Sequence, residues 1–296
     1  MTKIAVKLHS RSVVGAAFVA PATAFFTMFL LFPVLAVAAL AFTNWNGFNL
    51  NQISWGGFGN FSQFASDGVF HEALVHTVIF VVVTTVVLNV VGLPIAMMIN
   101  TKVAGHEFLR IAMFLPLGLS PVLTAILWQQ MLGPYGLINH VVVNTLHWRS
   151  TPIGFLGDPH MALMTVLLAS VWQYAGYNML LYYAGLQSLP KERLEAASID
   201  GAGAMRQLRY VTLPYLRPVI AVVVVLNLIG GWKVFDLVYV LTNGGPNNST
   251  QMLSTYLYLQ AFTLNRVGYA SAIALTIIAL AAVSALMRRR LAGEAI

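Results

Sequence analysis

Long apolar runs separated by shorter polar connections dominate the pattern of the chain. Runs of about the length that a helix needs to cross a hydrocarbon core occupy 14–42, 73–99, 109–132, 161–186, 219–241 and 267–287. Strands of a membrane barrel are about half as long and alternate in polarity, and these runs do neither. Because backbone amides in lipid must be satisfied within their own segment, each run is predicted to be a helix. We expect an all-α membrane protein with six transmembrane helices in one domain over 13–290, flanked by tails at 1–12 and 291–296.

Composition agrees with this pattern. Hydrophobic residues make up 58% of the chain and charged residues 8%, whereas a soluble domain carries about 25% charged residues. So few charges could not solvate the surface of a soluble protein of this length. The absence of cysteine excludes disulfides and thiolate metal sites. The first run is about twice as long as the apolar part of a signal peptide, so we expect a retained helix.

The basic residues predict the orientation of the helices, because cytoplasmic connections carry an excess of Lys and Arg. Thirteen basic residues fall on one side, only Arg149 and Arg266 fall on the other, and Lys233 lies within a run. The thirteen are Lys3, Lys7, Arg11, Lys102, Arg110, Lys191, Arg193, Arg206, Arg209, Arg217, Arg288, Arg289 and Arg290. Both termini are therefore predicted to be cytoplasmic. The net charge of +7 is then a topology signal that favours neighbouring anionic lipid headgroups and not nucleic acid.

Several runs contain proline, at Pro21, Pro33, Pro94, Pro116 and Pro121. Proline removes a backbone hydrogen bond and kinks a helix, and neighbouring helices repair the loss in membranes. Two interpretations remain open at this point: ordinary helix shaping, or hinges in a conformational cycle.

The cytoplasmic connection over 188–215 is unusually elaborate. Ser188 is placed to cap a short amphipathic helix whose first turn contains Pro190 and Glu192. Gly201 and Gly203 are expected to end that helix. The connection is either a simple tie between two spans or a surface that docks on another subunit, and its length and punctuation favour docking.

Two further features of this connection bear on docking. Leu194, Ala197 and Ser198 would share one helix face that is small enough for close approach by another surface. A second short helix is expected around 204–210, ending at Leu213-Pro214 before the fifth span.

A family resemblance rests on this connection. Glu195-Ala196-Ala197, then Asp200-Gly201-Ala202 after two residues, and then Leu213-Pro214 resemble the EAA loop of binding-protein-dependent ABC importer permeases. The stretch 235–250, Phe-Asp-Leu-Val-Tyr-Val-Leu-Thr-Asn-Gly-Gly-Pro-Asn-Asn-Ser-Thr, resembles the end of the fifth core span in the MalF/UgpA-like branch, which imports carbohydrates and glycerol phosphate. The likeness extends from about the second span to the C-terminus.

The resemblance implies a mechanism with several partners. The loop would dock in a cleft of an ATPase subunit, with Glu195 as the charged contact, Ala196 and Ala197 allowing close packing, and Gly201 turning the chain. The partners would be a second permease subunit in a heterodimer, an ABC ATPase dimer and an extracytoplasmic solute-binding protein. The chain would be a non-catalytic, multi-pass protein of a prokaryotic cell (inner) membrane.

ATP hydrolysis is assigned to a partner, since the chain has no Gly-x-x-x-x-Gly-Lys-Ser/Thr phosphate loop. No cofactor is expected on this chain, and ATP and Mg would be held by the ATPase. His71, His76, His106, His140, His147 and His160 lie mostly at run ends or in connections, so no metal site is predicted. Neither a Ser/His/Asp set nor a carboxylate pair for acid–base catalysis is apparent.

Polar residues within the runs are candidates for the substrate path. Gln173, Tyr174, Tyr177 and Asn178 place amides and phenols beside aromatic faces in the fourth run, a mixture that suits sugar hydroxyls, and the resemblance also implies substrate contacts in this region and in the fifth run. Asn89 and Asn227 are weaker candidates, expected to form interhelical hydrogen bonds.

Lys233 and Asp236 are the charged candidates. They are three residues apart in the fifth run and would share a helix face if that run were continuous. They form either a structural ion pair near the outer interface or part of the substrate path.

The alternative class is an ion-coupled secondary transporter, which needs ion-binding groups near the midplane and usually internal repeats. Only Lys233 and Asp236 are available for that role, and the capped loop would stay unexplained. An intramembrane enzyme, a further rival, lacks an evident nucleophile.

Overall fold

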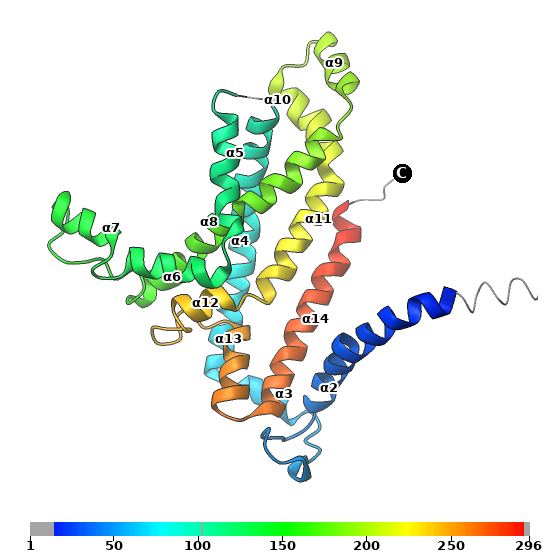
Figure 1. The fold of residues 1–296 in the computed structure, drawn as a ribbon, viewed down its shortest axis with the longest axis vertical. Coiled ribbons are helices and arrows are strands. Elements are labelled where there is room, and N and C mark those ends of the chain that lie inside the picture. The colour runs from blue at the N-terminus through cyan, green and yellow to red at the C-terminus, as the bar shows by residue number, and fades with distance from the viewer. Residues whose placement is uncertain (1–14, 102, 293–296) are drawn as a thin grey trace, which may run out of the picture. The chain divides into compact units, whose positions relative to one another are not determined.

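The structure is a computed structural model that describes residues 15–101 and 103–292, and its regular secondary structure in these ranges is helical (Figure 1). The predicted tail at 1–12 lies outside the described residues. The only bridge among the described residues joins Thr43 and Trp55. After a helical stretch at 15–26, the elements are η1 (Thr27–Leu31), α2 (Phe32–Leu40), η2 (Leu50–Gln52), α3 (Gly59–Gln63), η3 (Phe64–Ser66), α4 (Gly68–Asn100), α5 (His106–Phe114), η4 (Leu115–Gly118), α6 (Pro121–Leu132), α7 (Leu137–His140), η5 (Val141–Thr145), α8 (Pro159–Gln187), α9 (Lys191–Ile199), α10 (Ala204–Gln207), η6 (Leu208–Thr212), α11 (Leu213–Trp232), α12 (Asp236–Leu241), α13 (Leu253–Tyr258), η7 (Leu259–Thr263) and α14 (Val267–Ala292).

Apolar helices of membrane-spanning length account for most of the predicted runs. Within the described ranges, four helices are long and apolar enough to cross a membrane: Gly15–Leu40, Gly68–Asn100, Ala204–Trp232 and Val267–Arg288. A fifth span results if the bent pair His106–Gly118 and Pro121–Thr145 is counted as one. The fourth predicted run coincides with α8, a helix of 29 residues. The predicted helical class is confirmed.

The third predicted run is not one helix, and the continuous span at 109–132 was wrong. The two helices of this run are bent by 104° at a break between Gly118 and Pro121. Pro121 lies at the start of α6, and the Ser120 side chain caps that helix by accepting a hydrogen bond from the Leu123 amide. Proline therefore begins a new helix here, which an apolar pattern alone does not reveal.

The fifth predicted run also differs from its expected bounds of 219–241. The helix begins at Ala204, continues through Leu213 and Pro214, and ends at Trp232. The expected stop at Leu213-Pro214 is thus wrong: a π-helical segment, η6, joins α10 to α11, and the helix continues past Pro214.

Beyond Trp232 the chain breaks and restarts at Asp236 as α12. Lys233 is the residue that ends α11, so Lys233 and Asp236 do not share a helix face as predicted. Carbonyl groups freed at both breaks are satisfied by side chains: Gln173 donates to the Leu119 oxygen (3.1 Å) and Ser254 donates to the Val234 oxygen. Such repair is what permits irregular backbone inside a helical membrane protein.

The chain consists of two compact units. The first unit contains the described residues up to Ala65 together with Gln260–Leu275. Its loop is fixed by the buried Asn60, whose amide nitrogen donates to the carbonyl oxygens of Ala41 (2.9 Å) and Thr43 (2.8 Å). Around this loop lies a chain of aromatic contacts that joins Phe42, Trp55, Phe58, Phe61, Phe64 and Tyr269.

The second unit contains the described residues of Ser66–Leu259 and those from Thr276 onward. In it α4 packs against α8 and α11, with α9 and α10 at one end and α12 and α13 at the other (Figure 1). Two apolar clusters fill this unit. The first cluster comprises Phe80, Ala125, Val166, Leu167, Ala169, Leu237, Val238, Leu241 and Met252. The second cluster comprises Ala96, Ile99, Met179, Tyr182, Leu186, Leu216 and Val223.

Glycine brings the helices of the second unit close together. A methyl group at Gly176 would overlap with the Met113 carbonyl oxygen, and one at Gly92 would lie 2.8 Å from the Asn178 Cβ atom. Lipid tails are as apolar as the helices, so association depends on close packing and hydrogen bonds more than on the hydrophobic effect. The glycines therefore hold α8 against α5 and α4.

Candidate functional site

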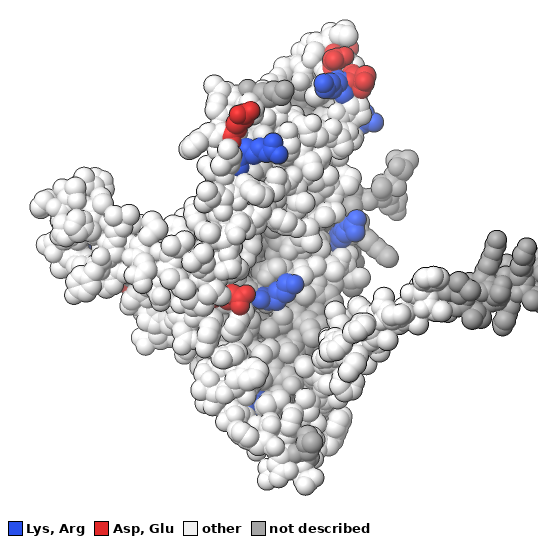
Figure 2. All heavy atoms as spheres, in the orientation of Figure 1, with Lys and Arg blue, Asp and Glu red and all other residues white. Residues whose placement is uncertain are grey.

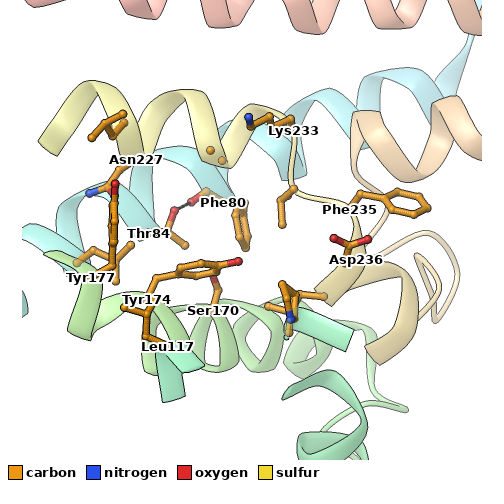
Figure 3. Close-up of a pocket in the computed structure, with 17 residues that line it drawn as sticks. Phe80, Thr84, Leu117, Ser170, Tyr174, Tyr177, Asn227, Lys233, Phe235 and Asp236 are labelled. Carbon is orange, nitrogen blue, oxygen red and sulfur yellow. Dashed lines mark hydrogen bonds between the residues drawn. The ribbon is translucent and has the colours of Figure 1, made fainter. Parts of the chain in front are cut away.

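A cavity of about 600 Å³ lies in the second unit (Figure 3). On α4, Phe80 of the first apolar cluster is followed by Thr84 and Leu88 on the cavity wall. The second apolar cluster begins beyond them on the same helix, at Ala96. The same order recurs on α8, so the cavity lies between the two clusters.

The cavity wall combines aromatic faces with hydrogen-bonding groups. Tyr174 and Tyr177 of α8 supply phenols, Asn227 of α11 supplies an amide, and Thr84 and Ser170 supply hydroxyl groups. The Thr84 hydroxyl donates to the Phe80 carbonyl oxygen (2.6 Å), which leaves its lone pairs available as acceptors. The Asn227 amide nitrogen has no hydrogen-bond partner among the described residues. Such a wall can hold a ligand that has both hydroxyl groups and an apolar ring face.

Charged groups line the end of the cavity where α11 stops. Lys233 and Asp236 flank the break between α11 and α12, and both side chains are exposed. Figure 3 shows the Tyr174 hydroxyl on the side of the cavity where Asp236 lies. Among the described residues no ion pair joins Lys233 to Asp236, so both charges are available to the cavity. The structural pair envisaged from the sequence is not formed.

Two of the predicted path residues do not line the cavity. Gln173 is 2% exposed and donates to the Leu119 carbonyl oxygen, so it repairs the break before α6. Asn178 is fully buried against Gly92, and neither its amide oxygen nor its nitrogen has a partner within the described ranges. Both side chains point into helix contacts and not into this cavity, so their place on the substrate path stays a prediction.

Asn89 and Asn227 differ in their surroundings. Asn89 accepts a hydrogen bond from the Tyr182 hydroxyl across the α4–α8 contact, which confirms its predicted interhelical role. Asn227 lines the cavity, as do Thr84 and Ser170, which were not singled out from the sequence. The signal that could have found them is that each is a polar residue within a predicted apolar run.

The loop between α8 and α11 forms a second candidate site, and its helix α9 starts differently from the prediction. Ser188 ends α8 and its hydroxyl donates to the Gly185 carbonyl oxygen (2.7 Å), while Pro190 occupies the N-cap position of α9 without a side-chain cap. The predicted Ser188 cap was therefore wrong. Glu192 lies in the first turn of α9, as expected.

The end of α9 matches the glycine signal. Gly201 has φ +76°, a left-handed conformation, and the Ala202 amide donates to the Ala197 carbonyl oxygen (2.9 Å) while the Gly201 amide donates to that of Ser198 (3.1 Å). This is the pattern of a helix end closed by glycine. Asp200 occupies the C-cap position, so the Asp200-Gly201-Ala202 triplet is the turn itself.

Side chains hold this loop in one arrangement. The Gln207 amide nitrogen donates to the Ser198 hydroxyl (2.9 Å) and to the Ala202 carbonyl oxygen (2.9 Å). The Tyr215 hydroxyl donates to the Ser188 carbonyl oxygen (2.6 Å), and the Arg193 guanidinium lies over the Tyr215 ring. The roles of Gln207 and Tyr215 were not predicted, because they depend on contacts between separate helices.

The free face of the loop differs from the face that was predicted. Leu194 and Ala197 are half-buried within the chain, and Ser198 is engaged by Gln207. Glu195 and Ala196 are exposed, and Ile199 is 86% exposed. The surface available to a partner therefore consists of the other side of α9, extended by the exposed Met205 of α10.

Apolar helices that enclose a cavity with phenol, amide and hydroxyl groups on its wall, and a helical loop fixed at one end, form the architecture of a membrane transport protein. The family comparison is more specific. Residues 89–293 match the family described as "Binding-protein-dependent transport system inner membrane component". The chain belongs to this family, and the resemblance to ABC importer permeases is confirmed.

Relatives align over nearly the whole chain. The lactose transport system permease protein LacF of Rhizobium radiobacter is 35% identical, over 95% of this chain and 94% of that protein. The multiple sugar-binding transport system permease protein MsmF of Streptococcus mutans is 34% identical, over 90% of this chain and 91% of the relative.

A solved structure has the same fold. It is that of a bacterial ABC transporter involved in the import of the acidic polysaccharide alginate, with a TM-score of 0.81 and 24% identity over 96% of this chain and 98% of the other. The chain is thus an inner-membrane, multi-pass permease with the fold of an ABC importer subunit.

Proposed function

We propose that this chain forms half of the translocation path of an ATP-driven importer for a sugar or sugar-like solute. The observation that carries the proposal is the cavity between the two apolar clusters, in a chain that belongs to a binding-protein-dependent transport family. Tyrosine rings can stack on a sugar ring while the Asn227 amide and the hydroxyl groups bond its hydroxyls. The names of LacF and MsmF, both sugar permeases, support the same solute class.

Six spans with both termini in the cytoplasm complete this proposal. One predicted span, α8, is not among the helices that are apolar enough to cross a membrane by composition. It is also the helix that supplies Ser170, Tyr174 and Tyr177 to the cavity. With 29 residues it is about 43 Å long, which is enough to cross a hydrocarbon core of about 30 Å. Polar residues that face a cavity and not lipid lower its apolarity without preventing a span.

The loop over 188–215 is proposed to transmit the action of a separate ATPase dimer. Glu195, Ala196 and Ile199 present a charged group, a small side chain and an exposed apolar side chain on one side of α9. Gln207 donates to Ser198 of α9, and Tyr215 donates to Ser188 at the end of α8, so a push on α9 is passed to α8 and α11. Because α8 and α11 both line the cavity, movement of the loop can change access to it.

Three partners follow from this proposal: a second permease subunit that completes the path, the ATPase dimer that binds ATP and Mg, and an extracytoplasmic binding protein that delivers the solute. A bound periplasmic protein occurs in a second solved structure of an alginate importer, which has the same TM-score of 0.81 at 23% identity. The chain itself is proposed to bind no cofactor and to be non-catalytic.

Affinity purification in mild detergent tests the assembly. The chain should copurify with an ATPase, a second permease and, after crosslinking, a binding protein. The recovered binding protein can then be screened by thermal shift against neutral sugars, acidic sugars and glycerol phosphate. Isolation of the chain without an ATPase, combined with ion-driven uptake by the chain alone, would instead support an ion-coupled secondary transporter.

A further inference from the structure

A groove of about 570 Å³ lies on the second unit, apart from the cavity described above. Its wall comes from α5 and η4, with one residue of α8, Leu180. Glu107 and Arg110 form its charged end, and Ile111, Phe114 and Leu115 continue it as an apolar surface. The groove therefore changes from polar to apolar along the direction of α5.

The charged end carries one group of each sign. Glu107 and Arg110 are the only charged residues of α5, and both are exposed. Figure 2 shows a red and a blue patch beside each other over the start of this helix. Although the two residues are three apart on a helix, where such pairs can meet, they form no ion pair among the described residues. Both groups are thus available to a ligand.

Arg110 is held in place by an aromatic ring. Its guanidinium carbon lies 5.7 Å from the centre of the Tyr183 ring of α8. The N–H groups of a guanidinium lie in its own plane. When its face stacks on a ring, these N–H groups stay free at the edge and can bind a phosphate in bidentate fashion. Arg110, held in this way, is therefore better placed to bind a phosphate group than a freely moving arginine side chain would be.

The apolar part of the groove is open. Ile111, Phe114 and Leu115 are exposed, and the neighbouring Phe108 is 77% exposed. A membrane protein can leave such side chains uncovered where hydrocarbon is the solvent. The groove thus places a cation and an anion at the end of an apolar surface, within the length of α5.

We propose that this groove binds a zwitterionic aminophospholipid of the phosphatidylethanolamine type. Arg110 binds the lipid phosphate, Glu107 accepts hydrogen bonds from the ammonium group, and the acyl chains lie along Ile111, Phe114 and Leu115. The groove has one charge of each sign and the headgroup has the same, so their charges are complementary. Phosphatidylglycerol lacks the ammonium group, and phosphatidylcholine has an ammonium group without N–H donors. This site requires a membrane location but no particular solute.

Native mass spectrometry of the assembled transporter, purified with its copurifying subunits, tests the proposal. At equal mole fractions of the three lipids, the wild-type complex should retain phosphatidylethanolamine up to about fivefold over phosphatidylglycerol and phosphatidylcholine, the range expected for one exposed ion pair. Glu107→Gln should abolish this preference, and Arg110→Gln should lower retention of all three lipids. An unchanged preference in Glu107→Gln would overturn the proposal.

A matched control is Arg193→Gln, because Arg193 also stacks on a tyrosine, Tyr215, but lines no such groove. It should leave the lipid preference unchanged, and an equal loss in this variant would show a general charge effect and refute the site. A benzoylphenylalanine photo-crosslinker at Ile111 identifies the occupant directly in membranes. An adduct with the mass of a phospholipid supports the proposal, whereas a crosslink to another polypeptide would show that the groove is a subunit interface.

Discussion

Tyr177 places a phenol on the cavity wall, where its hydroxyl can bond a solute hydroxyl. Tyr177→Phe should raise the half-saturating solute concentration for uptake about fivefold to tenfold, since one neutral hydrogen bond contributes about 1 kcal/mol net. Uptake of labelled solute by the reconstituted transporter measures this effect. The control is Tyr135→Phe, the same chemical change at a residue that is 99% exposed and outside the cavity. Equal effects of the two changes would argue against a cavity role.

Glu195 is the exposed acidic group on the free side of α9. Glu195→Lys should uncouple the two activities: ATP hydrolysis by the complex continues while solute uptake falls to background, because the loop no longer engages the ATPase correctly. Paired hydrolysis and uptake assays on the same proteoliposomes measure the ratio.

Glu192→Lys is the matched control for this change. Glu192 is an exposed acidic residue of the same helix, one turn earlier. It should retain most of the uptake, since loss of a favourable dipole contact costs only about 0.5 kcal/mol. Normal uptake in Glu195→Lys would contradict the assigned role of this residue.

At the scale of elements, the turn after α9 depends on one backbone conformation. Gly201 has a φ of +76° and Gly203 has a φ of −68°, and a methyl group at either position would meet no atom within 4 Å. Gly201→Ala should therefore strain the turn by about 1 kcal/mol, while Gly203→Ala should not.

We expect Gly201→Ala to lower the amount of ATPase that copurifies with the chain by about fivefold. This is the change in binding equilibrium that corresponds to a strain of about 1 kcal/mol. Gly203→Ala should leave the amount unchanged. Quantitative immunoblots of the purified complexes measure it. Equal copurification in both variants would show that the left-handed turn is not needed for docking.

The contact between α5 and α8 depends on Gly176, where a methyl group would overlap with the Met113 carbonyl oxygen. Gly176→Ala should destabilise the complex by about 1–3 kcal/mol, which corresponds to a fall in melting temperature of roughly 2–12 °C. Differential scanning fluorimetry of the complex in detergent measures this. Gly118→Ala, at a position with open space around it, should melt within about 1 °C of the wild type.

The length of the apolar runs was sufficient to place α4, α8 and α14, because each is one uninterrupted run. It failed where the backbone breaks inside an apolar run, at 119–120 and at 233–235. Hydropathy does not report which carbonyl oxygens are satisfied, and the partners that permit the breaks come from distant segments, such as Gln173 for Leu119. For the same reason the sequence did not reveal that Gln173, predicted for the substrate path, is engaged in that repair.

The candidate sites were predictable to different degrees. The loop residues from Glu195 to Ala202 are contiguous, so their spacing alone indicated a helix followed by a glycine turn. The cavity is assembled from α4, α8 and α11, with the breaks before α6 and α12. Tyr174, Tyr177, Lys233 and Asp236 were found as polar residues within apolar runs, but which of them share a cavity depends on helix packing that a single sequence does not contain.

At the scale of the whole molecule, the proposed function divides the work among subunits. The chain supplies a cavity and a fixed loop, and the energy is proposed to come from an ATPase that it contacts through that loop. An ion-coupled transporter of the same size would carry its coupling-ion site itself. The two classes therefore differ in which proteins are needed for uptake and in what drives it.

Reconstitution in proteoliposomes measures that difference most directly. The chain is reconstituted alone, and also with the copurified permease, the ATPase and the binding protein loaded with its labelled solute. The account predicts uptake only by the full assembly, only with ATP and Mg inside the compartment that contains the ATPase, and no uptake by the chain alone under a proton or sodium gradient. Solute accumulation by the chain alone, driven by such a gradient without ATP, would contradict it.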